Sequence, residues 1–91
     1  MAIAVIFTPK SMNAGQYDAL IKGLDEAGAG APEGRLYHLC FGTGDQLRVI
    51  DVWESGETLE RFGQTLMPIA QQAGVDTGQP EVSPVHNTIQ G

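Results

Sequence analysis

The chain has 91 residues, of which 42% are hydrophobic and 18% charged, and its formal net charge at pH 7 is −6. This length leaves room for one domain, residues 1–91, with a single thin core, and the composition is that of a folded globular protein. The five cationic residues are scattered along the chain and form no basic stripe for phosphates, so the sequence predicts no nucleic-acid partner.

The longest uninterrupted apolar run, Ala2 to Phe7, is far too short to span a bilayer. It also lacks the basic flank and the cleavage region of a signal peptide. The single cysteine, Cys40, cannot form an internal disulfide, and it lies in an apolar stretch where a reduced thiol behaves as a small hydrophobe. We therefore expect a cytoplasmic protein with no membrane partner.

The first part of the chain predicts a strand and then a helix. Ala2 to Phe7 is typical of a strand buried on both faces, and Pro9 ends it because proline has no N–H for the ladder. Asn13, with Gln16 three residues later, has the spacing of a capping box at a helix start. The helix should end at Gly28. Its inner face consists of apolar side chains at spacings of three and four, namely Tyr17, Leu20, Ile21 and Leu24.

The middle of the chain predicts a hairpin. Residues Arg35 to Phe41 form a second strand, and Gly42 to Asp45 is a short glycine-bearing turn. Gln46 to Glu54 is then the antiparallel third strand, rich in the aliphatic and aromatic side chains that fill a buried pleated surface.

A second helix and a final strand complete the chain. Ser55 is the expected N-cap and Gly74 the expected end of this helix. Pro68 lies inside the helical pattern, so we expect a kink or a break into two pieces near Leu66. The last strand, Glu81 to Ile89, should lie at a sheet edge, because it is bracketed and interrupted by prolines.

The order β-α-β-β-α-β defines the predicted fold class, an α+β ferredoxin-like split βαβ arrangement. Its crossovers place the first and third strands in the centre of a four-stranded antiparallel sheet, with two helices on one face. Those two strands are apolar on both faces, so the uncovered face would be an unusually large apolar patch. We therefore predict a homodimer whose sheets pack face to face, with Ile50 and Val52 toward the partner and Trp53 toward the helices.

The segment Val49 to Phe62, VIDVWESGETLERF, resembles the dimeric α+β barrel superfamily, and within it the small antibiotic-biosynthesis-monooxygenase-like proteins. The resemblance covers nearly the whole chain in element order and size. It implies a protomer paired as a dimeric α+β barrel, with a pocket between sheet and helices and Trp53 in the pocket wall. The superfamily includes cofactor-independent quinol oxygenases, haem-degrading enzymes and lactone isomerases. The second helix lacks the histidine used by the haem-degrading relatives, and the first strand lacks the asparagine used by some monooxygenases.

The candidate catalytic residues are His38 and Asp51. Side chains alternate along a strand, so a suitable register would bring His38, Asp51 and Trp53 into one pocket. Asp51 would then orient His38, which acts as a general base on an acidic C–H or O–H of a bound molecule. In the alternative interpretation, Asp51 pairs with Arg48, Arg35 or a backbone donor, and His38 is a core histidine whose hydrogen bonds are satisfied.

Other residues complete this hypothetical pocket. Tyr17, Phe62 and Met67 are candidate lining residues, although core packing explains them equally well. His86, on the last strand, faces either the pocket or the partner subunit, or is simply a half-exposed residue of an edge strand. Cys40 has no adjacent cation or helix start to activate it as a nucleophile. A metal site would need His38, Cys40, Asp51 and His86, which lack the short paired spacing of such sites. The sequence therefore predicts no metal and no cofactor.

These observations leave two functional hypotheses. The first is a homodimer that binds a small aromatic or apolar molecule, as a cofactor-independent monooxygenase- or isomerase-like enzyme with His38 as its base. The second is a non-catalytic dimeric module for binding or accessory functions. They differ in whether a polar group points into an apolar cavity.

Overall fold

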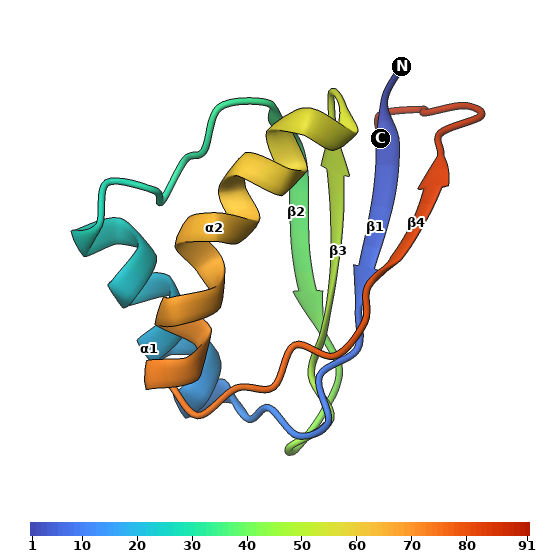
Figure 1. Cartoon of the computed structure of the whole chain (residues 1–91). Helices are drawn as coiled ribbons and strands as arrows, with labels where there is room; N and C mark the ends of the chain where they lie inside the picture. The colour runs from blue at the N-terminus through green and yellow to red at the C-terminus, as the bar shows by residue number, and fades with distance from the viewer.

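Six elements follow one another in the predicted order β-α-β-β-α-β (Figure 1). The computed structural model describes all residues, 1–91. The elements are β1 (Ile3–Phe7), α1 (Ala14–Glu26), β2 (Arg35–Phe41), β3 (Arg48–Trp53), α2 (Gly56–Gln72) and β4 (Glu81–Pro84). The predicted α+β ferredoxin-like fold class is confirmed.

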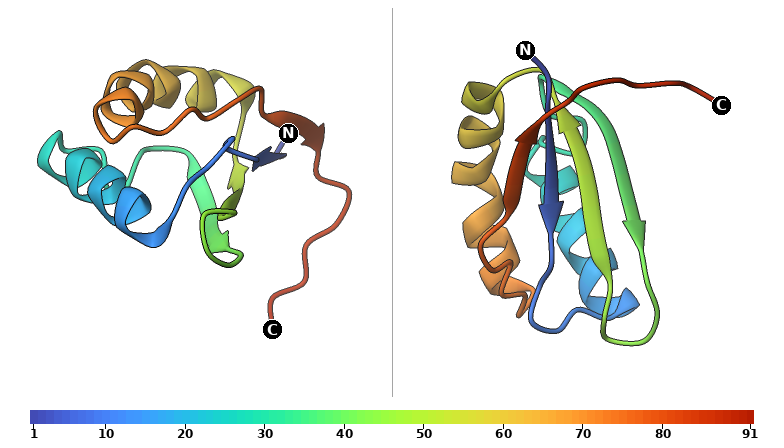
Figure 2. Two further views of the ribbon diagram at one scale, coloured as in Figure 1. Left: turned by 90° about the horizontal axis from the view of Figure 1, so that it is seen from below. Right: turned by 90° about the vertical axis from the view of Figure 1, so that its right-hand side faces the viewer.

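The four strands form one antiparallel sheet in the order β2-β3-β1-β4, so β3 and β1 are central as predicted. β4 lies at the edge, but the predicted extent of this strand, to Ile89, is wrong. It ends at Pro84. One further bond, from the Val85 amide to the Ala2 carbonyl, follows, and the chain then leaves the fold on the side away from the helices (Figure 2).

Both helices cover the same face of the sheet (Figure 2). The core lies between these two layers and combines side chains from the central strands, from both helices and from two connecting segments. Its buried hydrophobic members are Val5, Met12, Leu20, Leu24, Val49, Trp53, Phe62, Leu66, Ala70 and Val75. No helix combines the length and the apolar character needed to cross a bilayer.

The helix starts form as their side chains predict. Asn13 and Gln16 make the reciprocal capping box at the start of α1, and Ser55 accepts a hydrogen bond from the Thr58 amide at the start of α2. Of the kink or break predicted near Leu66, the break is wrong, because α2 continues as one helix through Pro68. Pro68 lies on the exposed side of the helix, where water can satisfy the carbonyl that the ring leaves without a partner.

The sheet face opposite the helices is apolar and uncovered. Ile50 of β3 pairs with Ile6 of β1 on one side and Leu39 of β2 on the other, and Val52 pairs in the same way with Ala4 and Tyr37. Paired residues of neighbouring strands point to the same face, so these residues form two apolar rows across three strands. Tyr37 is 53% and Leu39 41% exposed. Ile50 and Val52 thus point away from the helices; the pairing with a second chain stays a prediction.

Candidate active site

The register between β2 and β3 brings the candidate catalytic residues together. His38 pairs with Asp51 and Cys40 with Val49, on the side of the sheet that faces the helices. Toward the start of β2, Tyr37 pairs with Val52 and Arg35 pairs with Trp53. Two residue steps on β2 therefore match one step on β3. This is a β-bulge in which Leu36 is the extra residue. Because of the bulge, Arg35 lies on the same face as His38, although residues three apart in a regular strand lie on opposite faces.

A chain of hydrogen bonds runs from α1 through β2 to β3. His38 Nδ1 lies 2.6 Å from Asp51 Oδ1, and the Tyr17 hydroxyl lies 2.7 Å from His38 Nε2. Trp53 Nε1–H donates to the second carboxylate oxygen, Asp51 Oδ2, at 3.3 Å. A carboxylate only accepts, so Nδ1–H of His38 donates to Asp51; in the neutral tautomer with this proton, the Tyr17 hydroxyl donates to Nε2. Asp51 is only 2% exposed, and every buried polar side-chain atom in the chain has a hydrogen-bond partner.

Tyr17 reaches the sheet from the first turn of α1. Its ring is nearly parallel to that of His38, with an interplanar angle of 10°. Burial is the main cause that raises the pKa of Tyr17 above its ordinary value, while the positive charge of Arg35 opposes this shift. Tyr17 is therefore a protonated donor at neutral pH.

Cys40 lies on the same face, two residues beyond His38. Burial raises the pKa of its thiol, and the negative charge of Asp18 adds to the effect. A thiol that holds its proton is a poor nucleophile, which agrees with the sequence-based interpretation of Cys40 as a small apolar residue.

The hydrogen-bonded chain forms part of the wall of a small cavity between the sheet and the two helices. The cavity has a volume of about 50 Å³. This is room for a few water molecules, whereas ligand sites commonly occupy about 300 to 1,000 Å³. An aromatic ligand would have to displace side chains at the wall. The lining is mostly apolar and consists of Phe7, Pro9, Met12, Tyr17, Leu20, Ile21, Leu24, Arg35, His38, Val49, Asp51, Phe62, Leu66, Val75 and Thr77.

Four predicted site residues, His38, Asp51, Tyr17 and Phe62, line this cavity. Trp53 does not line it. It is fully buried beneath Asp51 and packs on Phe62, with ring centroids 5.0 Å apart.

Two expected lining residues lie elsewhere, so their assignment to the pocket is corrected. Met67 is 54% exposed, because it follows Leu66 by one residue and is rotated by about 100° from the inward row of α2. His86 is exposed and lies beyond the end of β4 at Pro84.

Arg35 is a charged lining residue that the sequence pattern does not assign to the pocket. Residues three apart in a regular strand lie on opposite faces, so Arg35 is not expected on the face of His38, and no local pattern marks the bulge at Leu36.

The alternative partners expected for Asp51 are not used. Both carboxylate oxygens are occupied by His38 and Trp53, and Arg48 lies over the Phe41 ring on the opposite face, 4.7 Å from its centroid.

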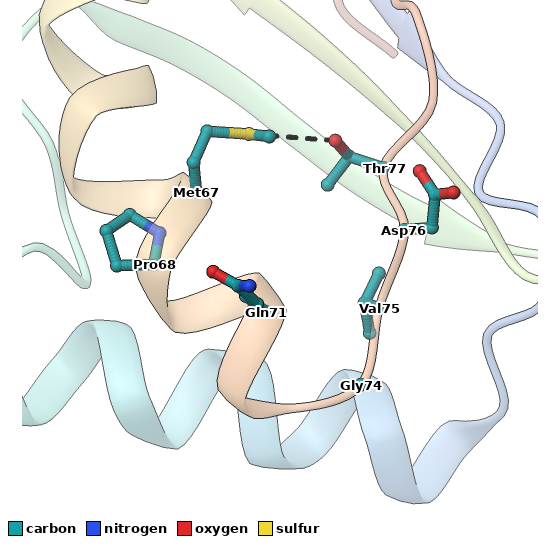
Figure 3. A pocket seen from close by; sticks show the side chains of 7 residues that line it. All are labelled: Met67, Pro68, Gln71, Gly74, Val75, Asp76 and Thr77. Carbon is teal, nitrogen blue, oxygen red and sulfur yellow. Dashed lines mark hydrogen bonds between the residues drawn. The ribbon is translucent and has the colours of Figure 1, made fainter.

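Met67 contributes to a larger hollow on the surface, about 520 Å³ and open to solvent (Figure 3). It lies between the end of α2 and the segment that follows. The Thr77 hydroxyl donates a weak hydrogen bond across it to the Met67 sulfur, at 3.7 Å. Apart from Asp76 this hollow contains no ionisable side chain, so we place the candidate chemistry in the small cavity. No three His, Cys, Asp or Glu side chains come close enough to bind a metal ion.

Comparison with known proteins shows the fold. No protein-family profile matches the sequence, and no curated protein does. Among solved structures, a Chloroflexus aurantiacus protein provisionally described as an antibiotic biosynthesis monooxygenase is 24% identical, with 100% of both chains covered and a TM-score of 0.60. SnoaB, a cofactor-independent oxygenase from Streptomyces nogalater, is 17% identical over 99% of this chain and 96% of its own, with a TM-score of 0.63.

A similarly described protein from Deinococcus radiodurans is 12% identical over 99% of this chain and 97% of its own, with a TM-score of 0.63. The chain therefore has the fold of the antibiotic-biosynthesis-monooxygenase-like α+β proteins, which its sequence resembles. At these identities the similarity defines the architecture and leaves the reaction to be argued from the site.

Proposed function

We propose that the chain is a homodimer that binds a small aromatic or apolar molecule beneath its helices and acts on it as a cofactor-independent monooxygenase- or isomerase-like enzyme. The observation that carries this proposal is the Asp51–His38–Tyr17 hydrogen-bonded chain in the wall of an apolar cavity. The shared fold with SnoaB, a cofactor-independent oxygenase, supports the same class of reaction.

The proposed base is Nε2 of His38. Asp51 accepts from Nδ1–H, which favours the tautomer whose Nε2 is unprotonated. A substrate that displaces the Tyr17 hydroxyl from Nε2 would place its own acidic C–H or O–H there. The proton moves to Nε2, the electron pair stays on the substrate as an enolate or phenolate, and Asp51 stabilises the imidazolium. The released Tyr17 hydroxyl can then donate to the new oxyanion.

Such an anion has two outcomes that match the two proposed reaction types. Reprotonation at a different atom completes an isomerisation. Reaction with O₂ oxidises the anion, and in a monooxygenation one oxygen atom enters the product while the other leaves as water.

The two apolar rows on the open sheet face support the proposed dimer. A face with half-exposed Tyr37 and Leu39 beside Ile50 and Val52 can pack on the same face of a second copy across a two-fold axis, and burying it removes apolar area from water. A second copy of the chain is therefore the proposed partner. The free Cys40 fits the reducing cytoplasm as the compartment.

The activity can be tested with 1,8-dihydroxyanthrone, whose central C–H₂ is acidic and whose oxidation by O₂ gives a coloured quinone and water. The wild-type protein should accelerate oxygen uptake. Substitution His38→Gln should lower the rate by about 100-fold or more, the usual contribution of a general base. The matched control is His86→Gln, which removes the other histidine of the chain outside the cavity. Equal rates for the two variants would contradict the role of His38.

The non-catalytic binding module remains the second candidate, and one observation favours it. Both ring nitrogens of His38 are already hydrogen-bonded in the resting protein, as in a purely structural network. This candidate predicts that aromatic molecules bind and perturb the Tyr17 and His38 signals in NMR spectra without any turnover.

A further inference from the structure

Arg35 is the only Lys or Arg side chain in the lining of the cavity. It is half-buried at the start of β2, and the bulge at Leu36 turns it toward the helices and onto the face of His38. Bulges often re-aim a side chain next to a functional site. The bulge therefore places a permanent positive charge in the wall of an otherwise mostly apolar cavity.

No carboxylate lies within 4.0 Å of the Arg35 guanidinium. The close contacts of this kind are the His38–Asp51 hydrogen bond and the ion pair of Arg61 with Glu57, and Arg35 belongs to neither. Its Nη2 donates to the Gly30 carbonyl at 3.1 Å, which uses one of the five N–H donors of the guanidinium. Asp51 lines the same cavity, but both its oxygens are engaged by His38 and Trp53.

We infer that the ligand of this cavity is an aromatic or apolar acid, whose carboxylate binds the Arg35 guanidinium while its reactive C–H or O–H faces His38. This inference rests on the proposed function and specifies its substrate class. A planar guanidinium matches a carboxylate with two parallel hydrogen bonds, and the charge-assisted bonds are stronger than neutral ones. Because the cavity wall carries both the Arg35 cation and the His38 base, the ligand would bind in one orientation.

The overall charge of −6 does not oppose this assignment. At physiological ionic strength, charges separated by more than about 8 Å are largely screened when exposed, whereas partly buried pairs are screened much less. The local contact with Arg35 is therefore screened less than the repulsion from the exposed carboxylates of the surface.

The test compares benzoate with benzamide, two probes of the same ring and nearly the same size that differ in charge. Their dissociation constants are measured by NMR titration of the wild-type protein and three variants. Benzoate should bind the wild type about tenfold or more tightly than benzamide, as expected for a charge-assisted contact. Arg35→Gln should abolish this preference and leave benzamide binding unchanged, whereas Arg35→Lys should retain part of it.

Arg61→Gln is the matched control, because Arg61 is an exposed arginine of α2 outside the cavity, and it should behave as wild type. The wild-type spectrum gives an independent readout should Arg35→Gln fold poorly: benzoate should shift the Nε–H signal of Arg35 and leave that of Arg61 in place.

Two failures are distinguishable. Equal binding of both probes with shifts at Tyr17 and His38 would overturn the role of Arg35 and leave a neutral-ligand pocket intact. Absence of any shift at Tyr17 and His38 with either probe at millimolar concentration would overturn this inference and the proposed small-molecule site together.

Discussion

Substitution Asp51→Asn tests the hydrogen-bonded chain without any knowledge of the ligand. Asp51 is almost fully buried and accepts from two donors, His38 Nδ1–H and Trp53 Nε1–H. The introduced amide has one acceptor oxygen. The indole N–H only donates, so that oxygen must stay on Trp53, and the amide NH₂ then faces His38 Nδ1. His38 can accept this bond only if its proton moves to Nε2, which removes the lone pair of the proposed base.

The cost to stability follows from the lost charge. Two hydrogen bonds to a buried carboxylate become neutral ones, and a hydrogen bond to a charged group contributes about 1.5 to 3 kcal/mol against about 1 for a neutral bond. We expect a loss of about 2 kcal/mol in the free energy of unfolding, allowing for the smaller desolvation cost of the amide. For a domain of this size that lowers the melting temperature by about 8 to 16 °C.

The assay combines thermal unfolding at one protein concentration with nitrogen NMR of the His38 ring, which distinguishes the two tautomers. Asp18→Asn is the control, because Asp18 is exposed and its side chain makes no hydrogen bond in the structure, so its change should stay within about 0.5 kcal/mol of wild type. A melting temperature of Asp51→Asn equal to that of the control, with the proton still on Nδ1, would refute the assigned network.

Three further outcomes are expected. Ile50→Asp puts a carboxylate at the centre of the open sheet face and should convert the proposed dimer to a monomer in sedimentation at micromolar concentration; a persistent dimer would contradict the proposed interface. Gly34→Ala should cost about 2 kcal/mol or more in chemical denaturation, because φ is +89° and the new Cβ would lie 2.6 Å from Thr58, whereas Gly44→Ala meets open space and should cost about 1 kcal/mol. Burial raises the pKa of Tyr17 above 10.0, so the folded state holds this proton more tightly; stability should fall as pH rises from about 10 through the folded-state pKa, and Tyr17→Phe should remove that dependence in melting curves.

The sequence predicts the parts of the fold that local chemistry determines. Asn13 and Ser55 start the helices because their side chains satisfy free backbone amides, whatever the rest of the chain does. Strict alternation along β3 assigned Asp51 and Trp53 to one face and Ile50 and Val52 to the other, and that strand is regular throughout.

The remaining features depend on contacts between distant segments. The Tyr17–His38 bond joins residues that are 21 positions apart, and only the packing of α1 on the sheet determines it. Pro68 fails to break α2 because tertiary packing of the helix outweighs one lost backbone bond on its solvent side. The position of Arg35 is not predicted, because the assignment of alternate residues to opposite faces assumes a regular strand. The extra residue at Leu36 reverses this assignment for the residues that precede it in β2.

The bulge also changes how this strand compares with those of other proteins. Leu36 is exposed and has no matching residue on the partner strand. In a related strand without this extra residue, the arginine at the same place in space would stand two positions before the histidine, whereas Arg35 stands three positions before His38. The spacings R-x-x-H with a bulge and R-x-H without one thus describe the same arrangement of cation and imidazole. A gapless sequence alignment across Leu36 would pair Arg35 with a residue on the opposite face and conceal a shared site.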